Sequence, residues 1–162
     1  MAQASKSLQD KKRKIYIFLA LIVVLTTALV IKKIYHRVSS EGTVSDAQVS
    51  NQESPYEKQL HLLSEEINKG CPTQVDQQTR LDNTEIVGKN EFRYNYTLIN
   101  LEKGNFDEAD LKQYLSAQIL ANLKDNEGMR LFREQKTKLS YHYKDRTGQP
   151  LFELNFGEGE YN

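Results

Sequence analysis

The sequence predicts an α+β protein in which a single N-terminal transmembrane helix precedes a small two-layer domain. That domain should place two or three helices on an antiparallel sheet of about four strands. Three observations predict this arrangement: an uncharged apolar run, two amphipathic helical stretches, and several segments that alternate apolar and polar side chains. The expected parts are a basic tail (1–14), the transmembrane helix (15–35), a flexible linker (38–53), the folded domain (54–157) and a frayed tail (158–162).

The apolar run at 15–31 contains 17 residues with no charge, Gly or Pro. As a helix it would be about 25 Å long, and the lysines beside it can snorkel to bridge a hydrocarbon core of about 30 Å. A buried core helix should show a polar face, which this run lacks. A cleaved signal peptide needs small residues after the run, where Ile31 to Tyr35 stand instead. We therefore expect residues 15–31 to lie in a lipid bilayer as an uncleaved anchor.

Charge is divided unevenly along the chain. Residues 1–37 carry eight Lys or Arg and one Asp, whereas the remainder carries 14 basic and 21 acidic side chains. The flank before the apolar run has more Lys and Arg than the flank after it, which predicts a cytoplasmic N-terminus and an extracytoplasmic C-terminal domain. The acidic domain argues against a nucleic-acid partner, because phosphate binding needs a basic surface.

Two segments of the domain carry helix signals. The sequence Ser54-Pro55-Tyr56-Glu57 matches a capping box with Pro at the first helical position, and apolar residues at helical spacing follow until Gly70. This predicts a helix over 54–69. Acidic residues from Asp107 onward suit the N-terminus of a second helix over 107–124, and residues 129–132 fit a further short helical piece.

The strand signals occupy the rest of the domain. Residues 79–87 fit one bent strand, and residues 91–101 alternate aromatic and polar side chains in a way that is typical of a half-buried strand. Residues 139–143 and 152–156 also alternate, and the turn between them, Asp145 to Gly148, predicts a β-hairpin.

One block is distinctive: Cys71-Pro72-x-x-Val75-Asp76-x-x-Thr79-Arg80-Leu81-Asp82, followed by Tyr-x-Tyr strands at 94–96 and 141–143. It resembles a group of small bacterial membrane-anchored or exported proteins with no assigned activity, and the resemblance covers roughly residues 60–156. The resemblance implies a bacterial inner-membrane setting, in which a single-pass chain would hold its domain in the periplasm. It implies no reaction.

The sharpest local set of side chains is Asp76, Thr79, Arg80 and Asp82. Two carboxylates flank a guanidinium, which is always charged and forms bidentate pairs. In one interpretation the set binds a peptide or an anionic group, with Arg80 as the contact. In the other it is a structural network that fixes an irregular strand to the first helix.

Cys71 is the only cysteine, which excludes an intramolecular disulfide and a Cys-rich zinc site. It is interpreted as a packing residue or, alternatively, as a reactive thiol paired with His61 or His142. The three histidines have no metal-ligand spacing, and the sequence has no phosphate loop or nucleophile elbow. We therefore expect neither a metal nor a cofactor.

These features favour a non-enzymatic interaction domain that binds another envelope protein through the sheet edge or through the loop around Arg80. Two alternatives stay open. A thiol-dependent or redox enzyme would use Cys71 as its nucleophile. An immunity-type inhibitor of a toxin would present the acidic domain to a basic partner.

Overall fold

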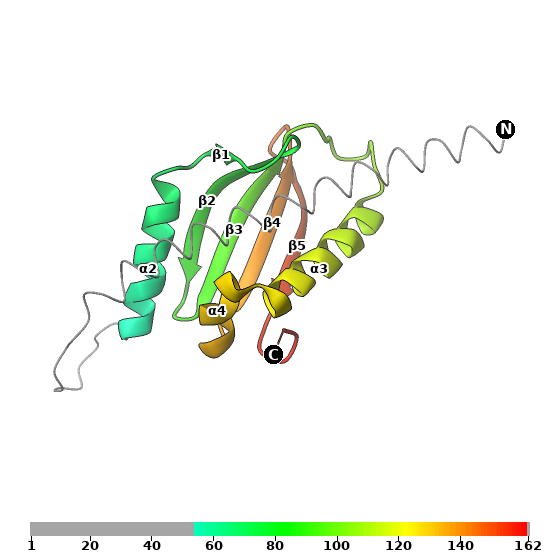
Figure 1. The fold of residues 1–162 in the computed structure, drawn as a ribbon. Helices are drawn as coiled ribbons and strands as arrows, with labels where there is room; N and C mark the ends of the chain where they lie inside the picture. Colours follow the sequence, from blue (N-terminus) through cyan, green and yellow to red (C-terminus); the bar gives the residue numbers. More distant parts are fainter. Residues whose placement is uncertain (1–53, 162) are drawn as a thin grey trace.

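The computed structural model describes residues 54–161, and its helices lie on one face of a five-stranded sheet (Figure 1). The helical elements are α2 (Pro55–Asn68), α3 (Glu108–Asp125), the 3-10 turn η1 (Glu127–Met129) and α4 (Arg130–Glu134). The strands are β1 (Thr73–Gln74), β2 (Thr79–Val87), β3 (Glu91–Leu98), β4 (Lys138–Asp145) and β5 (Pro150–Phe156). They stand side by side in chain order.

Local sequence explains both ends of α2. The Ser54 hydroxyl accepts the N–H of Glu57 at 3.1 Å, and the Glu57 carboxylate accepts the N–H of Ser54 at 2.6 Å, so the predicted capping box is formed. Leu60 and Leu63 are buried against the sheet, as their helical spacing requires. The helix then ends at Asn68, two residues before Gly70.

The prediction of the sheet is wrong in two respects. The observed sheet has five strands rather than about four, because the loop after α2 adds the two-residue strand β1. It is also not wholly antiparallel, because β3 and β4 are parallel neighbours. Parallel strands need a long crossover, and α3, η1 and α4 form that connection. The β4–β5 pair is the predicted hairpin, and β2 and β3 are also antiparallel neighbours.

The helix face of the sheet carries the core. Its central strands contribute stacked tyrosine pairs across the parallel ladder, with ring centroids 5.1 Å apart for Tyr94–Tyr141 and 5.3 Å apart for Tyr96–Tyr143. Such cross-strand aromatic pairs add to the stability that area burial provides. The other face bears alternating polar and charged side chains, and we call it the open face. The alternation therefore predicted the buried aromatic side chains of β3 and β4 correctly, but it did not predict that Thr97 and Ser140, on the open face, are buried as well.

Within the described part of the expected frayed tail (158–162), one residue is packed against the domain. Tyr161 is 2% exposed, and its hydroxyl donates to the carbonyl oxygen of Thr137. A single aromatic residue after two glycines thus fastens the tail, a contact that composition alone does not reveal.

Several predictions concern residues outside those that the structure describes. They are the basic tail at 1–14, the transmembrane helix at 15–35 with its bilayer contact at 15–31, and the linker at 38–53. Within residues 54–161, no helix is both long enough and apolar enough to cross a membrane.

Candidate functional site

The predicted set around Arg80 divides into two parts. Asp76 and Thr79 belong to a turn, in which one oxygen of Asp76, Oδ1, accepts the N–H groups of Gln78 at 2.6 Å and Thr79 at 2.7 Å. Burial raises the pKa of Asp76, and these two hydrogen bonds oppose the rise. Asp76 and Thr79 therefore stabilise the turn that leads into β2.

Arg80 and Asp82 lie in a separate network with residues of two other strands. The Arg80 Nε lies 2.6 Å from Asp82 Oδ1, while Thr97 Oγ1 and Lys144 Nζ lie 2.6 Å and 3.0 Å from Asp82 Oδ2. Burial opposes ionisation of Asp82, but the hydrogen bonds from Thr97, Lys144 and Arg80 together outweigh it and lower the pKa. Because the carboxylate already has three partners, this network ties β2 to β3 and β4.

Sequence reasoning found Arg80 and Asp82 but missed Thr97 and Lys144. The first two are close in sequence. Thr97 lies opposite Arg80 in the β2–β3 register, and Lys144 lies opposite Thr97 in the parallel β3–β4 register. The alternation in β3 places Thr97 on the same face as Arg93, but no pattern within β4 indicates its alignment with β3. The binding role of the four predicted residues remains a prediction.

A second network, centred on Glu91, was also missed. Its carboxylate accepts hydrogen bonds from Lys138 at 2.9 Å, Ser140 at 2.8 Å and Arg93 at 3.2 Å. Burial again opposes ionisation, but the bonds from Lys138, Ser140 and Arg93 lower the pKa of Glu91. Together, the Asp82 and Glu91 networks leave the charges on the open face largely paired with one another.

The thiol of Cys71 is half-buried beside α2 and donates a hydrogen bond to the carbonyl oxygen of Ile67 at 3.5 Å. Burial, followed by the nearby charge of Asp82, raises the pKa of Cys71, which disfavours the nucleophilic thiolate. His142 instead places its Nε2 3.6 Å from Glu153 Oε2. This environment resembles that of a packing cysteine more than that of an activated one.

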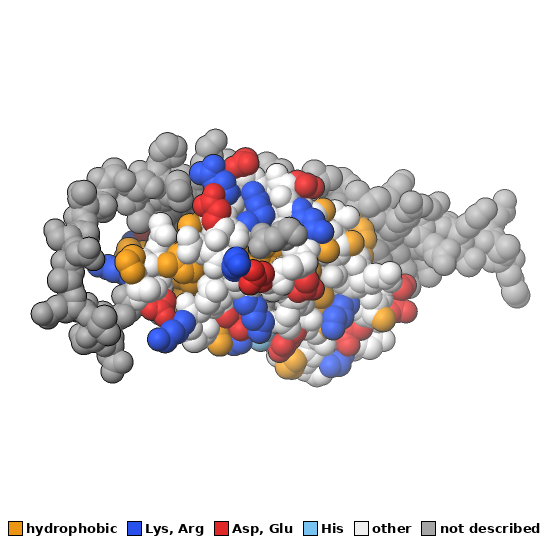
Figure 2. All heavy atoms as spheres, turned by 90° about the horizontal axis from the view of Figure 1, so that it is seen from below, with side chains coloured by type: hydrophobic (Ala, Val, Ile, Leu, Met, Phe, Trp, Pro, Cys, Tyr) orange, Lys and Arg blue, Asp and Glu red, His pale blue; other side chains and the backbone are white. Residues whose placement is uncertain are grey.

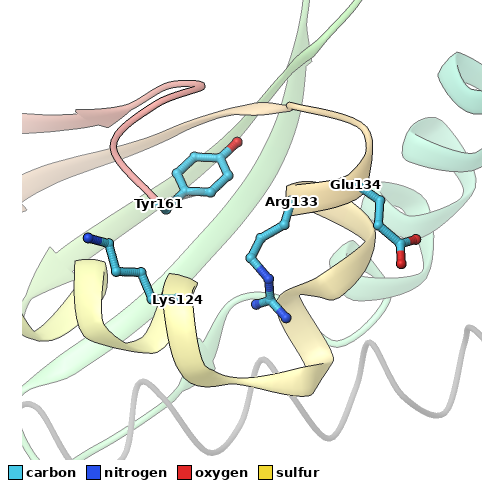
Figure 3. Close-up of a pocket in the computed structure, with 4 residues that line it drawn as sticks. All are labelled: Lys124, Arg133, Glu134 and Tyr161. Atoms are coloured by element: carbon cyan, nitrogen blue, oxygen red, sulfur yellow. The ribbon is translucent and has the colours of Figure 1, made fainter.

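An open hollow of about 540 Å³ is lined by Lys124, Arg133, Glu134 and Tyr161. Figure 3 shows the side chains of Lys124 and Glu134 pointing away from each other on opposite sides of it. The Arg133 guanidinium caps the end of α3, donating through Nη1 to the carbonyl oxygens of Leu123 and Asn126 at 2.8 Å. The polar groups therefore do not converge on one point, and the hollow lacks the geometry of a catalytic centre.

The β2 edge of the sheet is covered by hydrogen bonds from neighbouring elements. The side chain of Asn68, on α2, accepts the N–H of Thr84 at 2.7 Å and donates to its carbonyl oxygen at 2.8 Å, as a neighbouring strand would. Nearer the start of β2, β1 pairs with Leu81, and the N–H of Val75 donates to the carbonyl oxygen of Thr79 at 2.9 Å. Side chains and a short strand thus occupy most of this edge.

The β5 edge is different. Lys138 directs its N–H toward β3, and because main-chain groups alternate along a strand, Tyr141 turns toward its β5 partner Leu154. Glu153 and Asn155, on either side of Leu154, therefore turn their N–H and C=O groups away from the sheet. Within residues 54–161 no strand pairs with these groups, and we call them the open edge.

Each end of the open edge is capped by a side chain. Lys103 Nζ donates to the carbonyl oxygen of Pro150 at 2.8 Å, and Glu160 Oε2 accepts the N–H of Gly157 at 2.7 Å. The open edge is therefore a short gap between two occupied positions.

Comparison with known families identifies the domain. The model of one family, described as "Domain of unknown function (DUF8479)", matches residues 54–152. The chain belongs to this family. The match spans all the elements from α2 to the start of β5. No curated protein matches the chain.

One solved structure has a similar fold. It is a crystal structure from Pseudomonas aeruginosa, described as "a putative secreted protein", and it shares 16% sequence identity with this chain. The alignment covers 71% of this chain and 100% of that one, with a TM-score of 0.57. At this identity the likeness establishes the fold alone.

These findings correct the predicted single-pass inner-membrane localisation. The solved protein of similar fold is described as secreted, and no helix within residues 54–161 could span a bilayer. The single-pass assignment is corrected accordingly: the described residues form an α+β domain whose fold is similar to that of a protein described as secreted.

Proposed function

We propose that this member of the DUF8479 family is an exported domain that binds another protein outside the cytoplasm, by main-chain pairing at the open edge. The observation that carries the proposal is the pair of outward-facing residues Glu153 and Asn155, which no strand among residues 54–161 covers. A strand edge with free N–H and C=O groups is a template for another strand. The secreted description of the protein with the similar fold supports export.

The other candidate surfaces offer less to a partner. On the open face, the carboxylates of Asp82 and Glu91 are already bound by neighbouring cations and hydroxyls. Seen from below, positive and negative side chains are interspersed over the described surface rather than gathered into one patch (Figure 2). Among residues 54–161, the main-chain groups at the open edge have no strand partner, so a partner strand would gain hydrogen bonds there without breaking any that the described domain makes.

Site-specific photocrosslinking in the native host would test the proposal. We would place a photoreactive amino acid at Glu153 and, as a matched exposed control, at Lys124 beside the hollow. We expect a crosslinked protein from position 153 that position 124 does not give, and we expect Asn155→Pro to abolish it without unfolding the domain. The proposal is wrong if position 153 gives no crosslink of its own, or if Asn155→Pro leaves that crosslink unchanged.

A further inference from the structure

We propose that the occupant of the open edge is an extended segment with basic side chains, supplied by a partner protein and added as a sixth strand beside β5. This inference rests on the proposed function and adds the chemistry of the partner. It is carried by the side chains that flank the free main-chain groups.

The length of the gap sets the length of the contact. The register shift next to Pro150 and the cap at Gly157 leave Glu153 and Asn155 as the two outward-facing residues of the regular ladder, which provide two N–H and two C=O groups. Two residues in alternate positions suit an extended strand, whose main-chain groups have the same period. A helix satisfies its own main-chain groups and could not use them.

Charge favours a basic segment. The side chain of Glu153 is 59% exposed, and its neighbour across the register is His142, which forms an ion pair with it only when the imidazole is protonated. A Lys or Arg on an added strand, directly opposite Glu153, would form a cross-strand pair on the open face. The whole described domain points the same way, because residues 54–161 carry 18 Asp or Glu and 14 Lys or Arg, a net charge of −4.

A second copy of this chain fits less well. Two β5 strands paired antiparallel about Glu153 would set the two Glu153 carboxylates opposite each other, and like charges in that position are destabilising. Two domains of the same net charge would also repel each other as they approach. Self-association is therefore an outcome that would contradict the proposal.

The test uses the full chain, labelled with nitrogen-15, and two synthetic heptapeptides. In one, lysine alternates with threonine and valine; in its twin, glutamate replaces every lysine. Hydrogen exchange and amide chemical shifts would be followed at Glu153 and Asn155, with Leu154 as the internal control already paired to β4. We expect the lysine peptide to slow exchange at the two outward amides and to bind about two- to fivefold tighter than its twin, within the range of one cross-strand ion pair.

Two variants separate charge from main-chain pairing. Glu153→Gln should remove the preference for the lysine peptide while keeping the N–H donor. Asn155→Pro should remove protection by either peptide, because proline has no N–H.

The outcomes are distinguishable. Equal protection by both peptides would overturn the basic partner and leave strand addition standing. Absence of protection by either peptide, together with loss of the position-specific crosslink, would overturn the proposed function itself. Protection of both amides in the free chain, rising with protein concentration alongside a dimer in sedimentation, would assign the open edge to a second copy and overturn the partner proposal.

Discussion

The two edges of this sheet are treated differently by the rest of the domain. At the β2 edge, Asn68 imitates a missing strand by bonding to both main-chain groups of Thr84, and β1 pairs with the residues before it. At the β5 edge, Glu153 and Asn155 have no equivalent neighbour within residues 54–161. Unpaired edges invite association, and proteins usually cover or charge them. The contrast shows that this fold can cover a sheet edge with its own residues. The uncovered residues of β5 therefore point to a role for that edge.

The sharpest way to break this comparison is a pair of adjacent proline substitutions in β5. Leu154→Pro removes an N–H that faces β4 and also disturbs a buried side chain, so we expect it to cost about 3 kcal/mol or more of folding free energy. Asn155→Pro removes an N–H that faces outward, so it should cost less than about 1 kcal/mol. Urea unfolding monitored by circular dichroism would measure both. Equal costs would show that our assignment of inward and outward residues is wrong.

The covered edge can be tested by removing its cap. Asn68→Ala leaves the N–H of Thr84 without its Asn68 acceptor and leaves its carbonyl oxygen with only the Ser64 hydroxyl, and we expect a loss of about 2 kcal/mol. Asn100→Ala is the matched control, because Asn100 is exposed and donates to a single carbonyl oxygen, that of Gln77. Its expected loss is below about 0.5 kcal/mol. Chemical denaturation of both variants gives the two values, and similar losses would mean that Asn68 does not act as an edge cap.

Low pH should lower the stability of the domain through protonation of Asp145, at the end of β4. Its carboxylate accepts the N–H groups of Lys103, Thr147 and Gln149, and these bonds, that from Lys103 first, hold the pKa of Asp145 well below its usual range. A lowered folded-state pKa stabilises the protein above the unfolded value of about 3.9, and this contribution is lost as pH falls below it.

We therefore expect Asp145→Asn to lower the urea midpoint at pH 7 and to flatten its dependence on pH between 4 and 2. The same titration on the unsubstituted chain is the reference. A variant whose acid dependence matches the unsubstituted chain would contradict this role of Asp145.

The smallest expected effect is at the start of the covered edge, where burial raises the pKa of Asp76. A raised folded-state pKa makes the ionised group unfavourable, so its cost appears as pH rises above the unfolded value. Asp76→Asn keeps an Oδ1 acceptor for Gln78 and Thr79 and removes the charge. Between pH 4 and 7, the free energy of unfolding of the variant should rise relative to that of the unsubstituted chain, by less than about 1 kcal/mol. Paired thermal unfolding scans would detect this trend. A variant whose stability falls relative to the unsubstituted chain as pH rises would refute it.

Sequence reasoning succeeded where a signal is local. The capping box at Ser54, the alternation through Tyr94 and Tyr141, and the hairpin turn after Asp145 each involve residues close together in the chain. It failed where partners are distant. The parallel alignment of β3 with β4 depends on how a long crossover packs, so Lys144 could not be placed beside Asp82.

The candidate site illustrates the same limit. Asp76, Thr79, Arg80 and Asp82 looked like one cluster because they are near one another in sequence, yet the turn and the strand separate their roles. The sequence predicts binding at a sheet edge without indicating which edge. Identifying Glu153 and Asn155 required the direction of each main-chain group, which follows from strand register and not from side-chain chemistry.

The parallel contact between β3 and β4 has a consequence for how the domain assembles. The β2–β3 and β4–β5 hairpins join residues close in the chain, whereas Glu91 meets Lys138 only after the helical crossover between them has closed. Contacts between distant residues slow folding, because the intervening chain must lose its freedom first. We expect the two hairpins to form early and their docking to limit the folding rate. Shortening the crossover loop would then accelerate folding more than strengthening either hairpin.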